Sequence, residues 1–174
     1  SVDGALLSIG DPHAGQGDSE LAGTAIETSI TGQIQVILHK KEGISPILTD
    51  LNFPLLETED EWVIHGFSYA NYLEELGENA QKDIYQKSSI DLAMKDATYK
   101  TRWFLMNSLG LTEDEAYSLM SVAIDFGITQ VVDGNWGVHA TINKAMFEEM
   151  YSNLIFVRQI FENDISATVE WDEV

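Results

Sequence analysis

The spacing of the apolar residues changes at Ser88, and this change restricts the fold class more than any other feature of the chain. Before Ser88 the apolar residues lie in short runs or alternate with polar ones, as over residues 32–39, which is typical of β-strands. After Ser88 they recur every three or four residues up to Gly110, which is the period of one helix face. Strand patterns return after the helices. We therefore expect an α+β protein with barrel-like or sandwich-like antiparallel sheets and two to three helices packed on one side.

Turn residues and helix caps divide this pattern into elements. Thr112 and Glu115 have the spacing of a capping box, which predicts the start of a second helix, and Gly127 is predicted to end it. Asp133-Gly134-Asn135 indicates a hairpin turn between two strands. The expected strands cover residues 5–9, 24–29, 32–39, 45–49 (at a sheet edge because of Pro46), 62–67, 128–132, 136–142 and 165–171; a loop or short helix covers 69–87, and a last helix begins at Lys144.

Composition narrows the class of protein. The chain has 174 residues, enough for one domain, and its 9 Lys plus Arg against 29 Asp plus Glu give a formal net charge of −20. Such an excess of negative charge repels nucleic acids and anionic membrane surfaces, so neither is expected as a partner. The absence of Cys excludes disulfides, thiolate nucleophiles and Cys-based zinc sites. We expect a cytoplasmic protein, with an exported form as the alternative.

The residues best suited to chemistry lie close together near the start of the chain. Residues 8–20 contain Asp11, His13, Asp18 and Glu20 between three glycines, with Pro12 to stiffen the segment. Imidazole nitrogen is a zinc ligand and carboxylate oxygens bind hard divalent cations, so this segment is suited to a divalent metal site. The alternative is an acidic, solvated turn in which His13 only hydrogen-bonds a neighbour.

Two blocks of the sequence resemble the acetamidase/formamidase family. The first consists of Gly10-Asp11-Pro12-His13-Ala14, Gln16-Gly17-Asp18-Ser19-Glu20 and Gly23-Thr24-Ala25-Ile26-Glu27, close to a family signature written GDxHAxQGDGE followed by GTAIE. The second consists of Asp125-Phe126, Ile128 to Asp133, Gly137-Val138-His139-Ala140 and Lys144 to Phe147. Ser19 stands where the family usually has Gly, and Asn143 where it usually has Pro, which leaves substrate preference and local backbone shape open.

The resemblance implies hydrolysis of a short linear amide, formamide or acetamide, to ammonia and a carboxylate, and it implies that the loop of residues 8–20 is the site. We assign the roles within it by chemistry. Asp11 and His13 are the expected ligands of a zinc, calcium or magnesium ion, and Asp18 is a further candidate. Glu20 is the expected general base, with His13 and Asp18 also catalytic. His139 and Glu27 are expected to contact the substrate, whereas His65 and His39 are interpreted as structural sheet residues.

Two other hypotheses remain open. Ser1, if exposed by cleavage, has an α-amine that can activate its own hydroxyl, as in N-terminal-nucleophile hydrolases. The chain can also be a non-catalytic, acidic, cation-binding module with the same fold.

The chain begins just before the first block, whereas the resemblance implies a further β-rich segment ahead of it. Residues 1–174 are therefore expected to be the carboxy-terminal part of an acetamidase/formamidase-like domain. The predicted strands 5–9 and 62–67 are apolar on both faces and need cover on each side. We expect the upstream segment or subunit to supply that cover, the chain alone to aggregate or stay inactive, and the complete enzyme to be a homo-oligomer.

Overall fold

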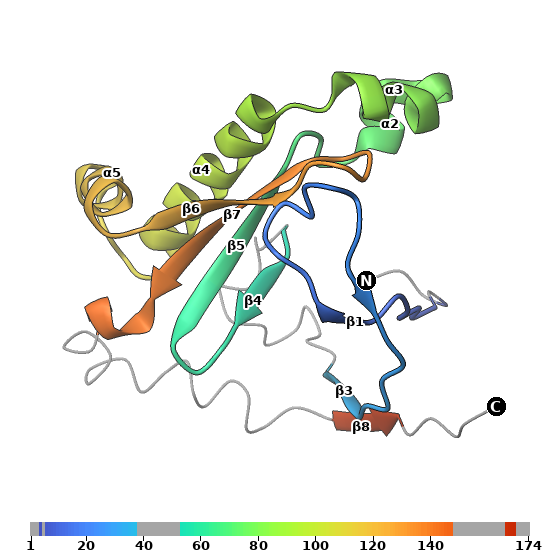
Figure 1. The fold of residues 1–174 in the computed structure, drawn as a ribbon. Coiled ribbons are helices and arrows are strands. Elements are labelled where there is room, and N and C mark those ends of the chain that lie inside the picture. The colour runs from blue at the N-terminus through green and yellow to red at the C-terminus, as the bar shows by residue number, and fades with distance from the viewer. Residues whose placement is uncertain (1–3, 5, 38–52, 148–165, 170–174) are drawn as a thin grey trace.

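The computed structural model describes residue 4 and residues 6–37, 53–147 and 166–169, the last of these for the backbone only (Figure 1). It has the α+β architecture that the sequence predicts, with antiparallel sheets and helices, and the described strands close no barrel. The elements are β1 (His13–Gly15), β2 (Ile26–Glu27), β3 (Ile34–Ile37), β4 (Leu55–Glu57), β5 (Glu61–Phe67), α2 (Tyr72–Leu76), the 3-10 turn η1 (Gly77–Asn79), α3 (Ala80–Lys87), α4 (Ile90–Asn107), α5 (Glu113–Val122), β6 (Asp125–Gln130), β7 (Gly137–Asn143), the 3-10 turn η2 (Lys144–Phe147) and β8 (Ser166–Val169).

The main sheet has four antiparallel strands in the order β4-β5-β7-β6 (Figure 1). Strand β5 alternates between buried and half-buried residues because successive side chains point to opposite faces. Trp62 and Ile64 lie on the buried face, and His65 lies on the other. His65 is directly opposite His139 of β7, so the two imidazoles leave the sheet on the same side.

Helix α4 packs on the buried face of the sheet, against β5 and β7. Its N-cap is Ser89, whose hydroxyl accepts a hydrogen bond from the Leu92 amide at 3.2 Å. The core between helix and sheet contains Ile64, Leu105 and Ile142, all fully buried. A Cβ at Gly66 would clash with the α4 backbone at Ala97, so only glycine permits this close approach.

An ion pair within α4, between buried Lys100 and half-buried Asp96, is hydrogen-bonded to the backbone of β5. The Lys100 ammonium donates to Asp96 Oδ2 at 2.6 Å and to the His65 carbonyl at 3.2 Å, and Asp96 Oδ2 accepts from the Phe67 amide at 2.8 Å. A buried Lys needs such partners because it loses hydration. The backbone of β5 is therefore fixed at His65.

Several predicted elements are confirmed. They include the strand at 62–67, the helix that follows Ser88, the Thr112 capping box, the hairpin around Gly134 and the carboxy-terminal strand, which is β8 and pairs with β3. Residues 69–87 form the short helices α2 and α3, and the strand predicted at 24–29 is shorter than predicted. The strand predicted at 32–39 begins at Ile34, and its residues 38 and 39 lie outside the described residues. Of the helix predicted from Lys144, the described residues 144–147 form a 3-10 turn. The predicted strand 45–49, Ser1 and His39 lie outside the described residues.

Two predictions are wrong. Residues 6–9 form no strand, and Leu6 is 96% exposed, because a strand needs a partner and none of the described residues pairs with this run. Gly127 does not end α5, which stops at Val122; it lies inside β6. A Cβ there would lie 2.7 Å from His139 Nε2, so glycine makes room for the imidazole of the neighbouring strand.

No described helix is long and apolar enough to cross a bilayer.

Candidate functional site

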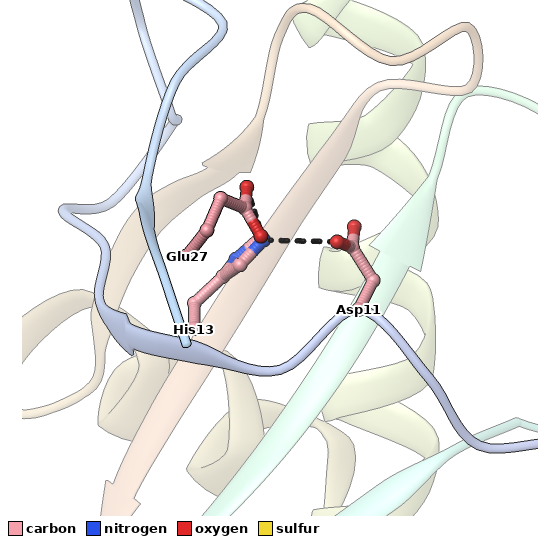
Figure 2. A group of neighbouring side chains, drawn as sticks. All are labelled: Asp11, His13 and Glu27. Carbon is pink, nitrogen blue, oxygen red and sulfur yellow. Dashed lines mark ion pairs between the residues drawn. The ribbon is translucent and has the colours of Figure 1, made fainter. Parts of the chain in front are cut away.

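The short β1-β2 pair brings three of the predicted site residues together. His13 of β1 lies opposite Glu27 of β2, and Asp11 approaches from just before β1 with a positive φ of 56°. His13 Nε2 lies 3.4 Å from Asp11 Oδ1 and 3.2 Å from Glu27 Oε1 (Figure 2). The ligand atoms of the three residues all lie within 4.8 Å of one another.

The hydrogen bond made by the other ring nitrogen of His13, Nδ1, determines whether the nitrogen that faces the two carboxylates carries a proton. Nδ1 lies 2.7 Å from Gln16 Oε1, which only accepts, so Nδ1 carries the proton. The neutral ring then directs the Nε2 lone pair at two carboxylates, which is repulsive unless a proton or a metal cation lies between them. Nε2 is inaccessible to solvent and has no hydrogen-bond partner among the described residues. The arrangement is therefore suited to a cation.

The same contacts raise the pKa of His13. The hydrogen bond to Gln16 is the largest cause, and the negative charges of Glu27 and Asp11 act in the same direction, whereas partial burial opposes them. Without a metal, the imidazole takes up a proton at a higher pH than an ordinary histidine. One imidazole nitrogen and two carboxylates also form a donor set that zinc accepts, and these residues fit a divalent ion.

The end of the acidic loop is attached to the edge of the main sheet. The Ser19 amide donates to the Thr129 carbonyl at 3.2 Å, and the Val131 amide donates to the Ser19 carbonyl at 3.2 Å. Ser19 and Glu20 both have positive φ, 73° and 45°, which is uncommon for residues other than glycine. The backbone contacts with β6 hold this conformation.

The carboxylate of Glu20 accepts a hydrogen bond from a side chain 110 positions further along the sequence. Gln130 Nε2 donates to Glu20 Oε2 at 2.6 Å and to Asp133 Oδ2 at 3.1 Å. Gln130 Oε1 accepts from the Val132 amide at 2.7 Å, so the orientation of this amide group is fixed on both sides. Glu20 is thus positioned by Gln130.

Asp18 lies beside a different imidazole. His139 Nε2 is 3.8 Å from Asp18 Oδ2, and His139 Nδ1 is hydrogen-bonded to Thr129 Oγ1 at 2.8 Å. Together with His65 these residues border a cavity of about 290 Å³ on the sheet face opposite α4. Thr129 lies where the β6-β7 register shifts, and such irregularities often redirect a side chain.

The predicted site residues therefore fall into separate groups. Asp11, His13 and Glu27 converge, Asp18 approaches His139, and Glu20 contacts Gln130. Among the described residues, the cluster that can hold a metal contains neither Asp18 nor Glu20. Glu27, predicted as a substrate contact, lies at a distance suited to a ligand. These contacts leave the catalytic roles as predictions.

Sequence reasoning missed two residues of these groups. Gln130 is part of the second matched block, but nothing local indicates its contact with Glu20. The sequence predicts that His65 is a hydrogen-bonded sheet residue; it lies in β5, but its Nε2 has no hydrogen-bond partner among the described residues. Its register opposite His139 is the signal, and it becomes visible only when the strands are paired.

Comparisons with known proteins agree with the sequence blocks. The profile of the acetamidase/formamidase family matches residues 1–149. The crystal structure of an acetamidase from Bacillus halodurans superposes with a TM-score of 0.51 at 19% identity, covering 79% of this chain and 38% of that one. The chain thus spans well under half the length of that structural neighbour, and the similarity supports the fold. No curated protein matches the sequence.

Proposed function

Because the chain belongs to the acetamidase/formamidase family, we propose that it serves in the hydrolysis of the C–N bond of a short linear amide, such as formamide or acetamide, with a divalent metal. The observation that carries this proposal is the convergence of the Asp11 and Glu27 carboxylates on His13 Nε2, which has no hydrogen-bond partner among the described residues. An imidazole ligand favours zinc over calcium or magnesium, which prefer oxygen.

Each residue of the cluster has a defined task. His13 Nε2 and the carboxylates of Asp11 and Glu27 would hold the ion, which supplies a Lewis acid and lowers the pKa of bound water. Gln16 keeps the proton on His13 Nδ1 and thereby leaves Nε2 as the donor to the ion. The two carboxylates also balance the charge of a divalent cation.

Glu20 is the proposed general base. It takes the proton of the attacking water and returns it to the leaving nitrogen, which must be protonated before the C–N bond breaks. Gln130 supports this role because it holds one carboxylate oxygen and leaves the other without a contact from the same amide group. Asp18 and His139 are proposed to bind the amide, since they line the cavity on the sheet face opposite α4.

Metal content and ammonia release test the proposal together. The complete enzyme, freed of metal, is expected to take up about one zinc per copy of this chain and then to release ammonia from formamide or acetamide, and calcium and magnesium serve as competitors. Glu20→Gln should lower turnover by about 10²- to 10⁴-fold while bound metal is retained. Glu78→Gln, on the surface of η1, is the matched control and should change neither quantity.

Equal loss of metal and turnover in Glu20→Gln would make Glu20 a ligand and contradict its role as a base. Protein that binds zinc but releases no ammonia from any short amide would identify a non-catalytic cation-binding module. Metal-independent ammonia release that depends on a free amino-terminal Ser1 would instead support the N-terminal nucleophile.

A further inference from the structure

The cavity on the exposed face of the main sheet has one polar and one apolar side. Leu56 of β4 and Val63 of β5 are directly opposite each other and form the apolar side together with Pro54. Asp18, His65 and His139 lie on the polar side. A site with an apolar wall and a few polar groups is the usual design for a small organic ligand.

The polar groups that face this cavity include the carboxylate of Asp18 and the imidazole of His139. His65 Nε2 is inaccessible to solvent and packs against Gly137, so this nitrogen does not contact a ligand in the cavity. Burial lowers the pKa of His65, and the neighbouring His139 and Lys100 act in the same direction, so the ring is neutral near pH 7. Asp18, with its side chain 77% exposed, adds a negative charge at the rim. A neutral ligand is favoured here over an anion.

The volume of the cavity sets the size of that ligand. At about 290 Å³ it holds roughly nine water-sized groups, at about 30 Å³ each. Formamide and acetamide would leave most of it unfilled. A hydrocarbon chain along Leu56 and Val63 would fill the remainder and remove apolar surface from water.

The cavity is also connected to the metal cluster by a short piece of chain. Gln16 binds His13 Nδ1, and Asp18 follows Gln16 by two residues, so the two Cα atoms are at most about 7 Å apart. Asp18 at the cavity is thus only two residues from the side chain that orients His13.

Resting on the proposed amidase function, we propose that this cavity is the acyl subsite and that it takes neutral aliphatic amides of roughly four to six carbons. The amide group lies at His139 and Asp18, and the chain lies along Leu56 and Val63. The carboxylate product is repelled by Asp18 and leaves.

The test compares a homologous series of amides from formamide to hexanamide by ammonia release from the zinc-loaded protein. The value of kcat/KM is expected to rise about 100-fold or more from acetamide to butyramide, since each of the two added methylenes contributes about tenfold or more in an apolar pocket. Val63→Phe fills the apolar side and should lower the ratio of butyramide to acetamide kcat/KM by about tenfold. Val122→Phe, 79% exposed on α5, is the matched control and should leave this ratio unchanged.

A steady fall in kcat/KM beyond acetamide, or an unchanged ratio in Val63→Phe, would overturn the acyl subsite. Circular dichroism checks that the variants fold. If Val63→Phe is unfolded, Leu56→Ser decides instead, because Leu56 is 58% exposed and its replacement removes apolar surface without overpacking.

Direct binding separates this inference from the proposed function. Saturation-transfer NMR of the metal-free protein should show butyramide bound about fivefold more tightly than butyrate, with Val63→Phe weakening butyramide alone. Butyramide binding without ammonia release from any amide would sink the proposed amidase and leave the cavity as a neutral-amide site. Ammonia release from acetamide without selective butyramide binding would overturn the acyl subsite alone.

Discussion

The acidic loop region, residues 6–37, and the sheet–helix body, residues 53–147, obtain their structure in different ways. The body contains all the fully buried apolar side chains of the described residues, whereas the loop region has short strands and exposed apolar side chains such as Ile26 and Ile30. The loop region nevertheless carries the candidate metal cluster. The comparison shows that the loop region depends on the body for much of its shape. Its contacts with the body are hydrogen bonds to Thr129, Gln130 and Val131.

The histidines show the same contrast. His13 in the loop faces carboxylates and an amide oxygen, and its pKa is raised, whereas His65 in the body is desolvated beside His139 and Lys100, and its pKa is lowered. One residue type is thus set up for opposite tasks by its surroundings. In the loop it attracts a cation, and in the body it stays neutral.

The largest expected difference between the regions comes from adding one methyl group. Gly66→Ala should lower the free energy of unfolding by about 3 kcal/mol or more, because the new Cβ meets the backbone of Ala97 and Ala93 in α4. Gly17→Ala in the loop, where a Cβ has nothing within 4 Å, should change it by less than about 0.5 kcal/mol. Urea denaturation measures both. Equal effects would show that the loop is packed as tightly as the body.

Changes at the metal cluster should reverse this order, with a large effect on chemistry and a small one on stability. Asp11→Asn and His13→Ala are expected to abolish amide hydrolysis and to weaken zinc binding by about 100-fold or more. The melting temperature of the metal-free protein should stay within a few degrees of the original, because truncation here removes little packing. Asp114→Asn on α5 serves as a surface control. Loss of the fold together with activity would show that these residues are structural.

The junction between the two regions should show an intermediate effect. Gln130→Ala removes the donor to Glu20 and the acceptor of the Val132 amide, and we expect turnover to fall about tenfold and the free energy of unfolding by about 1 kcal/mol. Gln86→Ala, on the exposed side of α3, is the matched control. Steady-state kinetics and denaturation give the two values. Unchanged turnover with lowered stability would mean that Gln130 holds the loop but does not position Glu20.

The smallest expected effect is on pH dependence, and it has opposite signs in the two regions. The raised pKa of His13 stabilises the metal-free protein below about pH 6.5, and this contribution is lost as the pH rises through the raised value. The lowered pKa of His65 acts the other way, because stability is lost as the pH falls from about 6.5 toward the lowered value. Zinc affinity should likewise fall as the pH drops below the raised pKa of His13.

Unfolding free energies between about pH 5 and 8 test these signs. His13→Gln should flatten the part of the curve above about pH 6.5, and His65→Gln the part below it. The same direction of change in both variants would contradict the contrast between the regions.

The sequence by itself determined the features that depend on neighbouring residues. The capping box of Thr112 and Glu115 and the turn at Gly134 each span only a few positions, and both occur as predicted. The run over 62–67, apolar on both faces, predicted the strand β5, and the two blocks around His13 and His139 indicated the family. Such signals are readable because caps, turns and side-chain period are local interactions.

Only the tertiary structure decided which distant groups meet. Glu27 reaches His13 through strand pairing, His65 faces His139 through the β5-β7 register, and Gln130 holds Glu20 across 110 positions of sequence. The two wrong predictions have the same origin. Residues 6–9 lack a strand partner in the described part of the chain, and Gly127 is used for the imidazole of His139 instead of a helix end. Register and packing depend on the whole chain at once, so no local pattern contains them.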